Sequence, residues 1–181
     1  AGNDGIPTTD APKDLYPIRA DIYPAGYSYV LGVMATDKNG NLASFSNWDY
    51  TPIENCEYEL TAPGKDIYST LPGNRYAKWS GTSMAAPFVA ATAAIIRSHY
   101  DDKDTYSSRF IMGQIVSATT EKTGSYPALS VYDSIYYLPK PNLSVKDMFL
   151  MDNAENDEIN DGDAIIDAGE VIDLGVLVRN Q

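Results

Sequence analysis

Apolar residues follow strand-like patterns in the first part of the chain. Residues 30–35 are almost continuously apolar, which is typical of a strand buried on both faces of a sheet. Residues 58–61 predict a second strand, which a Pro-Gly pair ends. Two shorter strands, over residues 67–71 and 76–79, flank a turn and predict a hairpin. The pattern therefore predicts short strands joined by long irregular loops.

The spacing of apolar residues then becomes helical. Residues 83–99 are small, Ala-rich and apolar on almost every side, which predicts a helix buried in a core. A second helix is expected over residues 105–118, with Asp104 as its N-cap, and a short third one over residues 129–137. Buried strands followed by buried helices predict an α/β fold for residues 1–138.

The C-terminal part of the chain has a different pattern. Residues 143–151 and 171–178 alternate loosely between apolar and polar positions and predict the first strands of a β-sandwich. The Pro-rich residues 139–142 predict a linker. We therefore expect one domain over residues 1–138 and the beginning of an accessory β-sandwich domain over residues 143–181. Both ends look cut, since no signal peptide is visible and the last predicted strand has no partner, so we interpret the sequence as a piece of a longer polypeptide.

Charge and composition narrow the possible functions. The chain carries 25 acidic and 13 basic residues, a formal net charge of −12, which argues against a nucleic-acid partner because phosphate binding needs clustered positive charge. Hydrophobic residues make up 44% of the chain and charged residues 21%, as in globular proteins. The longest apolar stretch, residues 84–96, is too short to cross a bilayer, so no membrane span is expected. The single cysteine, Cys56, cannot form an internal disulfide.

Acidic residues are concentrated in one loop near the C-terminus. Residues 152–173 hold nine acidic residues and no basic one. Their hard oxygen ligands, closely spaced around a glycine, suit Ca²⁺, although the spacing does not fit an EF-hand. A solvated acidic turn explains the same composition, and a Ca²⁺-dependent adhesin-like β module is a further interpretation of residues 142–181. The candidate metal ligands are Asp161, Asp163, Asp167 and Glu170.

The strongest candidate for chemistry is a serine at the start of the predicted buried helix. The sequence Gly81-Thr82-Ser83 leads from a small-residue turn into the helix. The free backbone N–H groups of a first helical turn favour negative charge beside the Ser83 hydroxyl. A nucleophile of acyl transfer needs this arrangement, because a donor must face the oxyanion that forms on attack. The alternative is that Ser83 only caps the helix.

Several segments in order resemble the subtilisin-like serine proteases, the subtilases. The resemblance covers residues 1–138 and rests on AGNDG at residues 1–5, on YPAGY at residues 23–27, on VLGVMATDKNGNLASFSN at residues 30–47, on LTAPG at residues 60–64 and on IYSTLPGNRYAKWSGTSMAAPFVA at residues 67–90. It implies part of a subtilisin-like fold, a parallel sheet with buried helices, and a secreted or cell-surface serine endopeptidase. Its partners would be protein or peptide substrates, and its chemistry requires no cofactor, while a structural Ca²⁺ ion is compatible with it.

The resemblance assigns roles to individual residues. Ser83 corresponds to the nucleophile, and Asn3 to the residue whose carboxamide donates to the oxyanion beside the Ser83 N–H. Local chemistry alone favours Asn3 as a turn residue in Gly-Asn-Asp-Gly, and its position in the ordered set of motifs reverses this preference. Gly2 and Ile22 correspond to substrate-binding positions, with Ile22 at the base of the first specificity pocket. Phe88 departs from the family, which usually has a histidine there.

The resemblance also implies that two catalytic residues lie upstream of this chain. The family order is Asp, His, Ser, with the oxyanion Asn between His and Ser, and the chain begins at the Asn segment. The single histidine, His99, follows Ser83 by 16 residues on the same predicted helix, about 24 Å away, and cannot act as its base. We therefore expect the missing N-terminal part of the same polypeptide as a partner and no peptide hydrolysis by this chain alone. The alternative is a catalytically dead homologue that acts as a scaffold or binding module.

Overall fold

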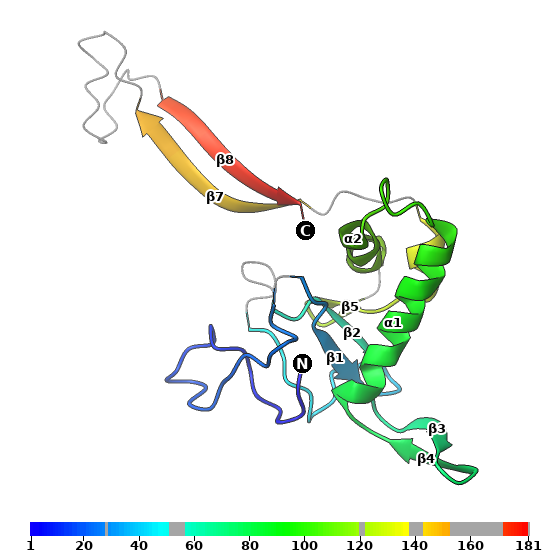
Figure 1. The fold of residues 1–181 in the computed structure, drawn as a ribbon. Helices are drawn as coiled ribbons and strands as arrows, with labels where there is room; N and C mark the ends of the chain where they lie inside the picture. Colours follow the sequence, from blue (N-terminus) through cyan, green and yellow to red (C-terminus); the bar gives the residue numbers. More distant parts are fainter. Residues whose placement is uncertain (28, 51–56, 120–121, 138–142, 153–171, 181) are drawn as a thin grey trace, which may run out of the picture. The chain divides into compact units, whose positions relative to one another are not determined.

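The computed structural model describes residues 1–27, 29–50, 57–119, 122–137, 143–152 and 172–180 (Figure 1). The chain divides into two compact units, Ala1–Lys140 and Pro141–Gln181. The predicted linker at residues 139–142 and Cys56 lie outside the described residues.

A two-stranded parallel sheet lies at the centre of the first unit. β1 (Val33–Thr36) pairs with β2 (Leu60–Pro63), in a register that aligns Val33 with Leu60. All four residues of β1 are buried, as the continuous apolar run predicted, and the first three residues of β2 are buried as well. Parallel pairing with helices against the sheet confirms the predicted α/β class.

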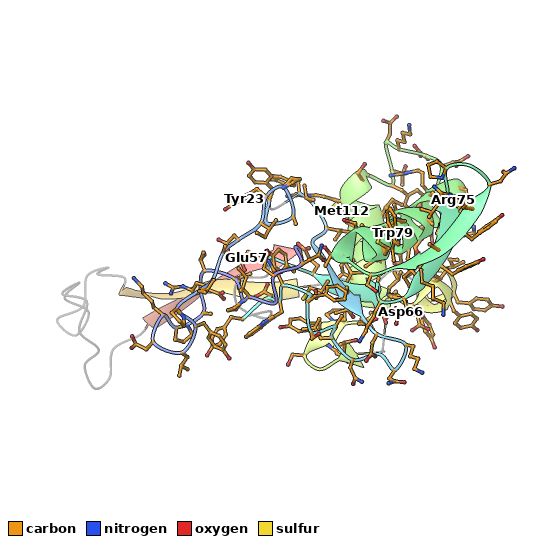
Figure 2. All side chains as sticks on the ribbon, turned by 90° about the horizontal axis from the view of Figure 1, so that it is seen from below. Tyr23, Glu57, Asp66, Arg75, Trp79 and Met112 are labelled. Atoms are coloured by element: carbon orange, nitrogen blue, oxygen red, sulfur yellow. The ribbon has the colours of Figure 1, made fainter. Side chains whose placement is uncertain are left out.

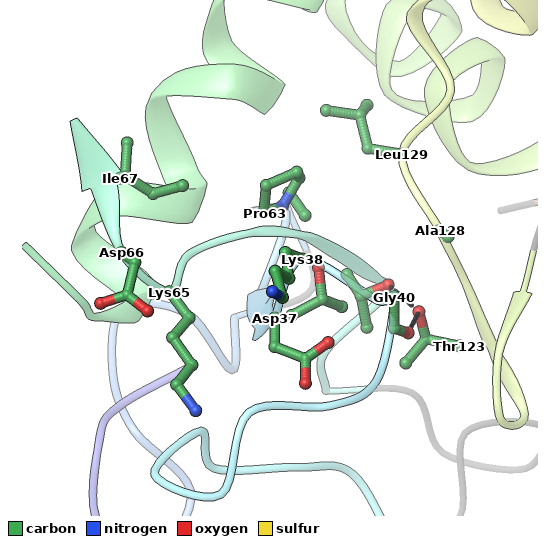
Figure 3. Close-up of a pocket in the computed structure, with 13 residues that line it drawn as sticks. Asp37, Lys38, Gly40, Pro63, Lys65, Asp66, Ile67, Thr123, Ala128 and Leu129 are labelled. Carbon is green, nitrogen blue, oxygen red and sulfur yellow. Dashed lines mark hydrogen bonds between the residues drawn. The ribbon is translucent and has the colours of Figure 1, made fainter. Parts of the chain in front are cut away.

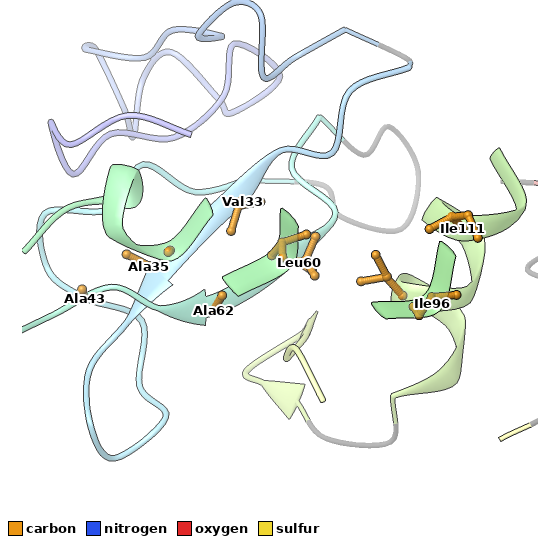
Figure 4. Packing of buried hydrophobic residues seen from close by; sticks show 10 residues of the cluster. Val33, Ala35, Ala43, Leu60, Ala62, Ile96 and Ile111 are labelled. Carbon is orange, nitrogen blue, oxygen red and sulfur yellow. The ribbon is translucent and has the colours of Figure 1, made fainter. Parts of the chain in front are cut away.

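One face of the long helix α1 (Thr82–His99) supplies much of the core. Its buried residues recur every three or four positions and contact β1 and β2. Buried side chains from both strands and from the helices form one hydrophobic cluster (Figure 4). The prediction of a helix buried all round is met on this face only, because Phe88 and Ile95 on α1 are 39% and 45% exposed.

Two shorter helices complete the first unit. α2 (Ser108–Ala118) begins three residues later than predicted, and the predicted cap, Asp104, is wrong. The Ser107 hydroxyl caps the helix instead by accepting from the Phe110 N–H at 3.3 Å. The preceding residues form a separate turn, in which the Asp102 carboxylate accepts from the Thr105 hydroxyl at 2.6 Å, and so they do not join the helix. α3 (Val131–Tyr136) lies within the segment predicted for it.

The predicted hairpin leads directly to the start of α1. β3 (Ile67–Leu71) and β4 (Arg75–Trp79) pair antiparallel, and Arg75 and Trp79 mark the ends of β4 in Figure 2. A second, very short pair follows α2, formed by β5 (Lys122–Thr123) and β6 (Tyr126–Pro127).

The second unit contains two long antiparallel strands. β7 (Leu143–Asp152) pairs with β8 (Ile172–Asn180), with a register shift between Val145 and Asp147. Strands were predicted over both segments, while the β-sandwich itself stays a prediction. The acidic loop between them, with Asp161, Asp163, Asp167 and Glu170, lies outside the described residues. Among the described helices, none combines the length and the apolar character needed to cross a bilayer.

Candidate active site

The turn before α1 is packed tightly against the end of the sheet. The Gly81 N–H donates to the Gly64 carbonyl at 2.8 Å, just after β2. A Cβ atom on Gly64 would lie 2.6 Å from the Ala35 Cβ and 2.9 Å from the Gly81 carbonyl oxygen. Only glycine allows this approach of the two backbones, so the sequence of β2 and its following turn fixes where α1 begins.

Ser83 is the second residue of α1 and is exposed. Gly81 occupies the N-cap position without a side-chain cap, so the alternative that Ser83 caps the helix is wrong. The neighbouring N–H groups are used, since Thr82 donates to Asn3 Oδ1 at 2.8 Å and Met84 to the Gly81 carbonyl at 2.9 Å. Among the described residues, the N–H and the hydroxyl of Ser83 have no hydrogen-bond partner.

Asn3 lies at the start of α1 although 79 residues separate it from Thr82. Its Oδ1 caps the first free N–H of the helix, which leaves Nδ2 as the end of the carboxamide that can donate elsewhere. No acceptor for Nδ2 is present within the described part of the chain. The Nδ2 and Oδ1 atoms are 3.6 and 3.7 Å from the point that a Cβ on Gly81 would occupy. The structure thus brings the Asn3 carboxamide and the Gly81-Thr82-Ser83 turn together.

Gly2 lies between the Gly81-Thr82-Ser83 turn and a second buried segment. Its N–H donates to Thr82 Oγ1 at 3.3 Å, so the Gly2-Asn3 pair and Thr82 exchange two hydrogen bonds. Its φ of +110° favours glycine, and a Cβ would meet Asn47 Nδ2 at 2.5 Å and Ile22 Cγ1 at 3.1 Å. Gly2 and Ile22, the two predicted substrate-binding residues, are therefore neighbours.

Sequence reasoning missed Asn47. Its side chain is fully buried, and its Oδ1 accepts from the N–H groups of Asp4 at 2.8 Å and Ile6 at 3.3 Å. Its own N–H donates to the Gly2 carbonyl at 3.1 Å. Asn47 ends a segment that carries the family resemblance, but nothing in the local Ser-Asn-Trp sequence indicates that it holds the segment around Asn3.

Burial shifts the pKa values of two glutamates that lie just before β2 in the sequence, Glu57 and Glu59. Burial raises the pKa of Glu59 to about 7, against a hydrogen bond from the Gly32 N–H at 2.6 Å that lowers it. Burial and the nearby Asp49 charge raise the pKa of Glu57 to about 7 as well. Carboxylate oxygens of Asp10, Asp49 and Glu57 lie within 4.8 Å of one another, a geometry that a cation could bind. Sequence analysis missed this cluster because folding brings Asp10 to Asp49 and Glu57 from a distant part of the chain.

The described residues do not bring a base to Ser83. His99 is the last residue of α1 and packs edge-on against Tyr100, with ring centroids 4.8 Å apart.

A cavity of about 500 Å³ opens beyond the ends of β1 and β2, lined by Asp37, Lys65 and Asp66 among others (Figure 3). Neither Ser83 nor Asn3 lines it. The Asp37 carboxylate accepts from backbone N–H groups of its own turn, and the largest of these effects, from the Asn39 N–H, lowers the pKa of Asp37.

Comparison with known sequences gives a consistent result. The sequence model of the subtilase family matches residues 1–135. The chain is 53% identical over 78 residues to the thermostable alkaline protease of Halalkalibacterium halodurans, a match of 43% of this chain and 20% of that protein. It is 40% identical over 115 residues to subtilisin DY of Bacillus licheniformis, which covers 64% of this chain and 35% of that protein. The chain therefore spans about a fifth to a third of these relatives.

Solved structures agree with the sequence comparison. A cold adapted subtilisin-like serine proteinase superposes with a TM-score of 0.55 at 26% identity, over 74% of this chain and 43% of that one. The self-cleaved protease domain of PatA gives a TM-score of 0.54 at 26% identity, over 75% of this chain and 46% of that one. In both cases the similarity covers less than half of the known structure.

Proposed function

The chain belongs to the subtilase family, and from this we propose that it supplies the nucleophile and the oxyanion donors of a serine endopeptidase. One observation carries the proposal. The hydrogen bond from the Thr82 N–H to Asn3 Oδ1, 2.8 Å long, holds the carboxamide at the start of the helix that presents Ser83. The donors left over, Asn3 Nδ2 and the Ser83 N–H, are those that a developing oxyanion requires.

The reaction follows from these groups. The Ser83 hydroxyl oxygen attacks the scissile carbonyl carbon while a base removes its proton, and the carbonyl oxygen becomes negatively charged. Asn3 Nδ2 and the Ser83 N–H donate to this oxygen, and the neutral amide of Asn3 stabilises the charge without giving up a proton. The protonated base then gives its proton to the leaving amine, and water hydrolyses the Ser83 ester.

We propose that the base and its orienting Asp lie in the N-terminal part of the same polypeptide, outside these residues. His99 lies at the opposite end of α1, about 24 Å from Ser83 at the helical rise. The exposed apolar side chains of Phe88 and Ile95 on α1 are compatible with cover by further polypeptide. The chain by itself is therefore expected not to hydrolyse peptides.

Hydrolysis of an unstructured protein substrate tests this proposal. A polypeptide that joins this chain to its upstream region should degrade casein, and Ser83→Ala should abolish the degradation. The 181-residue chain alone should leave casein intact. If the longer polypeptide keeps its upstream His and Asp and still fails to degrade casein, the alternative of a scaffold or binding module replaces the protease proposal.

Two proposals rest on the sequence alone. The family resemblance supports a secreted or cell-surface location. The spacing of Asp161, Asp163, Asp167 and Glu170 supports a Ca²⁺ site in the loop between β7 and β8. Calorimetric titration of the chain with CaCl₂ tests the second proposal, with Asp161→Asn plus Asp163→Asn as the matched variant. Heat of binding that this variant retains would assign Ca²⁺ to another site.

A further inference from the structure

Asn47 contacts the backbone on both sides of Asn3. Its N–H donates to the carbonyl of Gly2 at 3.1 Å, and its Oδ1 accepts from the N–H of Asp4 at 2.8 Å. Gly2 and Asp4 are the two chain neighbours of Asn3, so a single buried residue fixes both peptide groups that determine where the Asn3 side chain starts. A third hydrogen bond, from the Ile6 N–H at 3.3 Å, extends this hold along the segment.

The orientation of the Asn47 amide is determined by these contacts. Oδ1 accepts from two backbone N–H groups, so Nδ2 must point the other way, to within 2.5 Å of the position of a Cβ on Gly2. There Nδ2 is buried and has no hydrogen-bond partner in the described part of the chain. Leaving a buried donor unpaired is unfavourable, so this amide is a poor choice for stability alone. The effect of Asn47 is instead to fix the position of residues 2–6 through its Oδ1 atom.

We propose that Asn47 is a positioning residue, which acts on the reaction through Asn3. This inference rests on the proposed function for its catalytic consequence, but the positioning itself is a property of the chain. Asn47 fixes the backbone around Asn3, Asn3 Oδ1 holds the Thr82 N–H, and Nδ2 is thereby aimed beside the exposed Ser83. Loss of the Asn47 acceptor frees the Asn3 backbone and loosens the bond to Thr82.

Hydrogen exchange on the 181-residue chain tests the positioning without any need for activity. Asn47→Leu, which removes the acceptor and keeps a side chain branched at Cγ, should speed exchange of the Thr82 N–H relative to the β2 amides by roughly tenfold. Asn47→Asp keeps an acceptor oxygen and should preserve the protection. Gln114→Met is the matched control, because Gln114 is also a buried amide but donates to the carbonyls of Ser134 and Tyr137 and does not contact residues 2–6. Should Asn47→Leu not fold, Asn47→Ala makes the same test, because alanine has no acceptor and a smaller side chain.

Kinetics of the longer polypeptide separate positioning from simple stabilisation. Asn47→Leu should lower kcat by about 10- to 100-fold with little change in KM, since a small misplacement of a donor has this effect. In an Asn3→Ala background, Asn47→Leu should lower kcat no further. Unchanged Thr82 exchange, or multiplying effects of the two substitutions on kcat, would overturn the inference. An inactive longer polypeptide would count against the proposed function alone, because the exchange experiment still decides the positioning.

Discussion

The two ends of α1 carry a serine and a histidine, Ser83 and His99, which are residue types of a serine-protease triad. The surroundings of these two residues differ. At the first end, Asn3 Oδ1 accepts from the Thr82 N–H, and Ser83 is exposed, with no partner for its own N–H in the part of the chain that the structure describes. At the last end, Arg97 donates to two backbone carbonyls, those of Tyr100 at 2.9 Å and Tyr106 at 2.6 Å. His99 adds an edge-on ring contact there.

This difference shows that the surroundings of a helix end decide its role. At the last turn of α1, Arg97 complements the helix dipole, the Tyr100 N–H donates to the Ile96 carbonyl and the Ser98 hydroxyl donates to the Ile95 carbonyl. Within the described residues the Ser83 N–H of the first turn stays unpaired, because Asn3 caps only the Thr82 N–H. Ser83 therefore lies where the helix stabilises negative charge, while we assign His99 a structural role.

The largest expected effect comes from removing the proposed nucleophile, Ser83. In a polypeptide that also contains the upstream region, Ser83→Ala should lower kcat for a peptide substrate by on the order of 10⁶-fold, because the acyl-enzyme cannot form. His99→Ala is the matched change at the other end of α1 and should leave kcat within about twofold. A large loss of kcat in His99→Ala would contradict the assignment of His99 to a structural role.

Removal of the proposed oxyanion donor should have the next largest effect. Asn3→Ala should lower kcat by about 10²–10³-fold with little change in KM, because the donor acts on charge that develops in the transition state. Asn3→Asp keeps the acceptor for the Thr82 N–H but places a negative charge beside the oxyanion, so its kcat should be at least as low. Full activity of Asn3→Ala would remove Asn3 from the site.

Tight packing at the first end of α1 predicts a loss of stability on adding one methyl group. Gly64→Ala should lower the free energy of unfolding by about 1–3 kcal/mol, since its Cβ would lie 2.6 Å from the Ala35 Cβ. Gly26→Ala is the control, because there the nearest atom would be an ordinary 3.6 Å away. Chemical denaturation measures both variants, and equal stability would show that the turn adjusts without strain.

A smaller effect is expected from Glu59, which precedes β2. Because burial raises its pKa to about 7 in the folded state, the folded chain binds a proton more tightly than the unfolded chain, whose pKa stays near 4.5. Stability should therefore fall as pH rises from about 4.5 to 7. Glu59→Gln should weaken this fall and stabilise the chain at pH 8 by about 1–2 kcal/mol, with little effect at pH 4. An unchanged pH profile would show that Glu59 is ionised without penalty.

Local patterns predicted the elements better than the contacts between them. The apolar run indicated β1 because this strand is buried on two faces, a strand before the Pro-Gly pair indicated β2, and the turn residues indicated the β3–β4 hairpin. The start of α2 was missed because Asp102 closes a competing turn, which local propensity does not reveal. The one-sided burial of α1 depends on what surrounds it, and its sequence is apolar on the other side as well.

The candidate site was predicted from the order of its motifs and not from their chemistry. Local sequence explains Ser83 as a helix cap and Asn3 as a turn residue. Only the family resemblance placed these two residues, which are far apart in the chain, in one site. The hydrogen bond between Asn3 and Thr82 is the contact that the sequence could not supply. Asn47 stayed hidden because its partners, Gly2, Asp4 and Ile6, are brought to it by folding.

Labelling with a fluorophosphonate probe tests the central claim most directly, because the probe requires an activated serine. A polypeptide that joins this chain to its upstream region should form one adduct, which peptide mass spectrometry should locate on Ser83. The 181-residue chain alone and the Ser83→Ala variant should form none. An adduct on another serine, or equal labelling of Ser83 in the chain alone, would contradict the account.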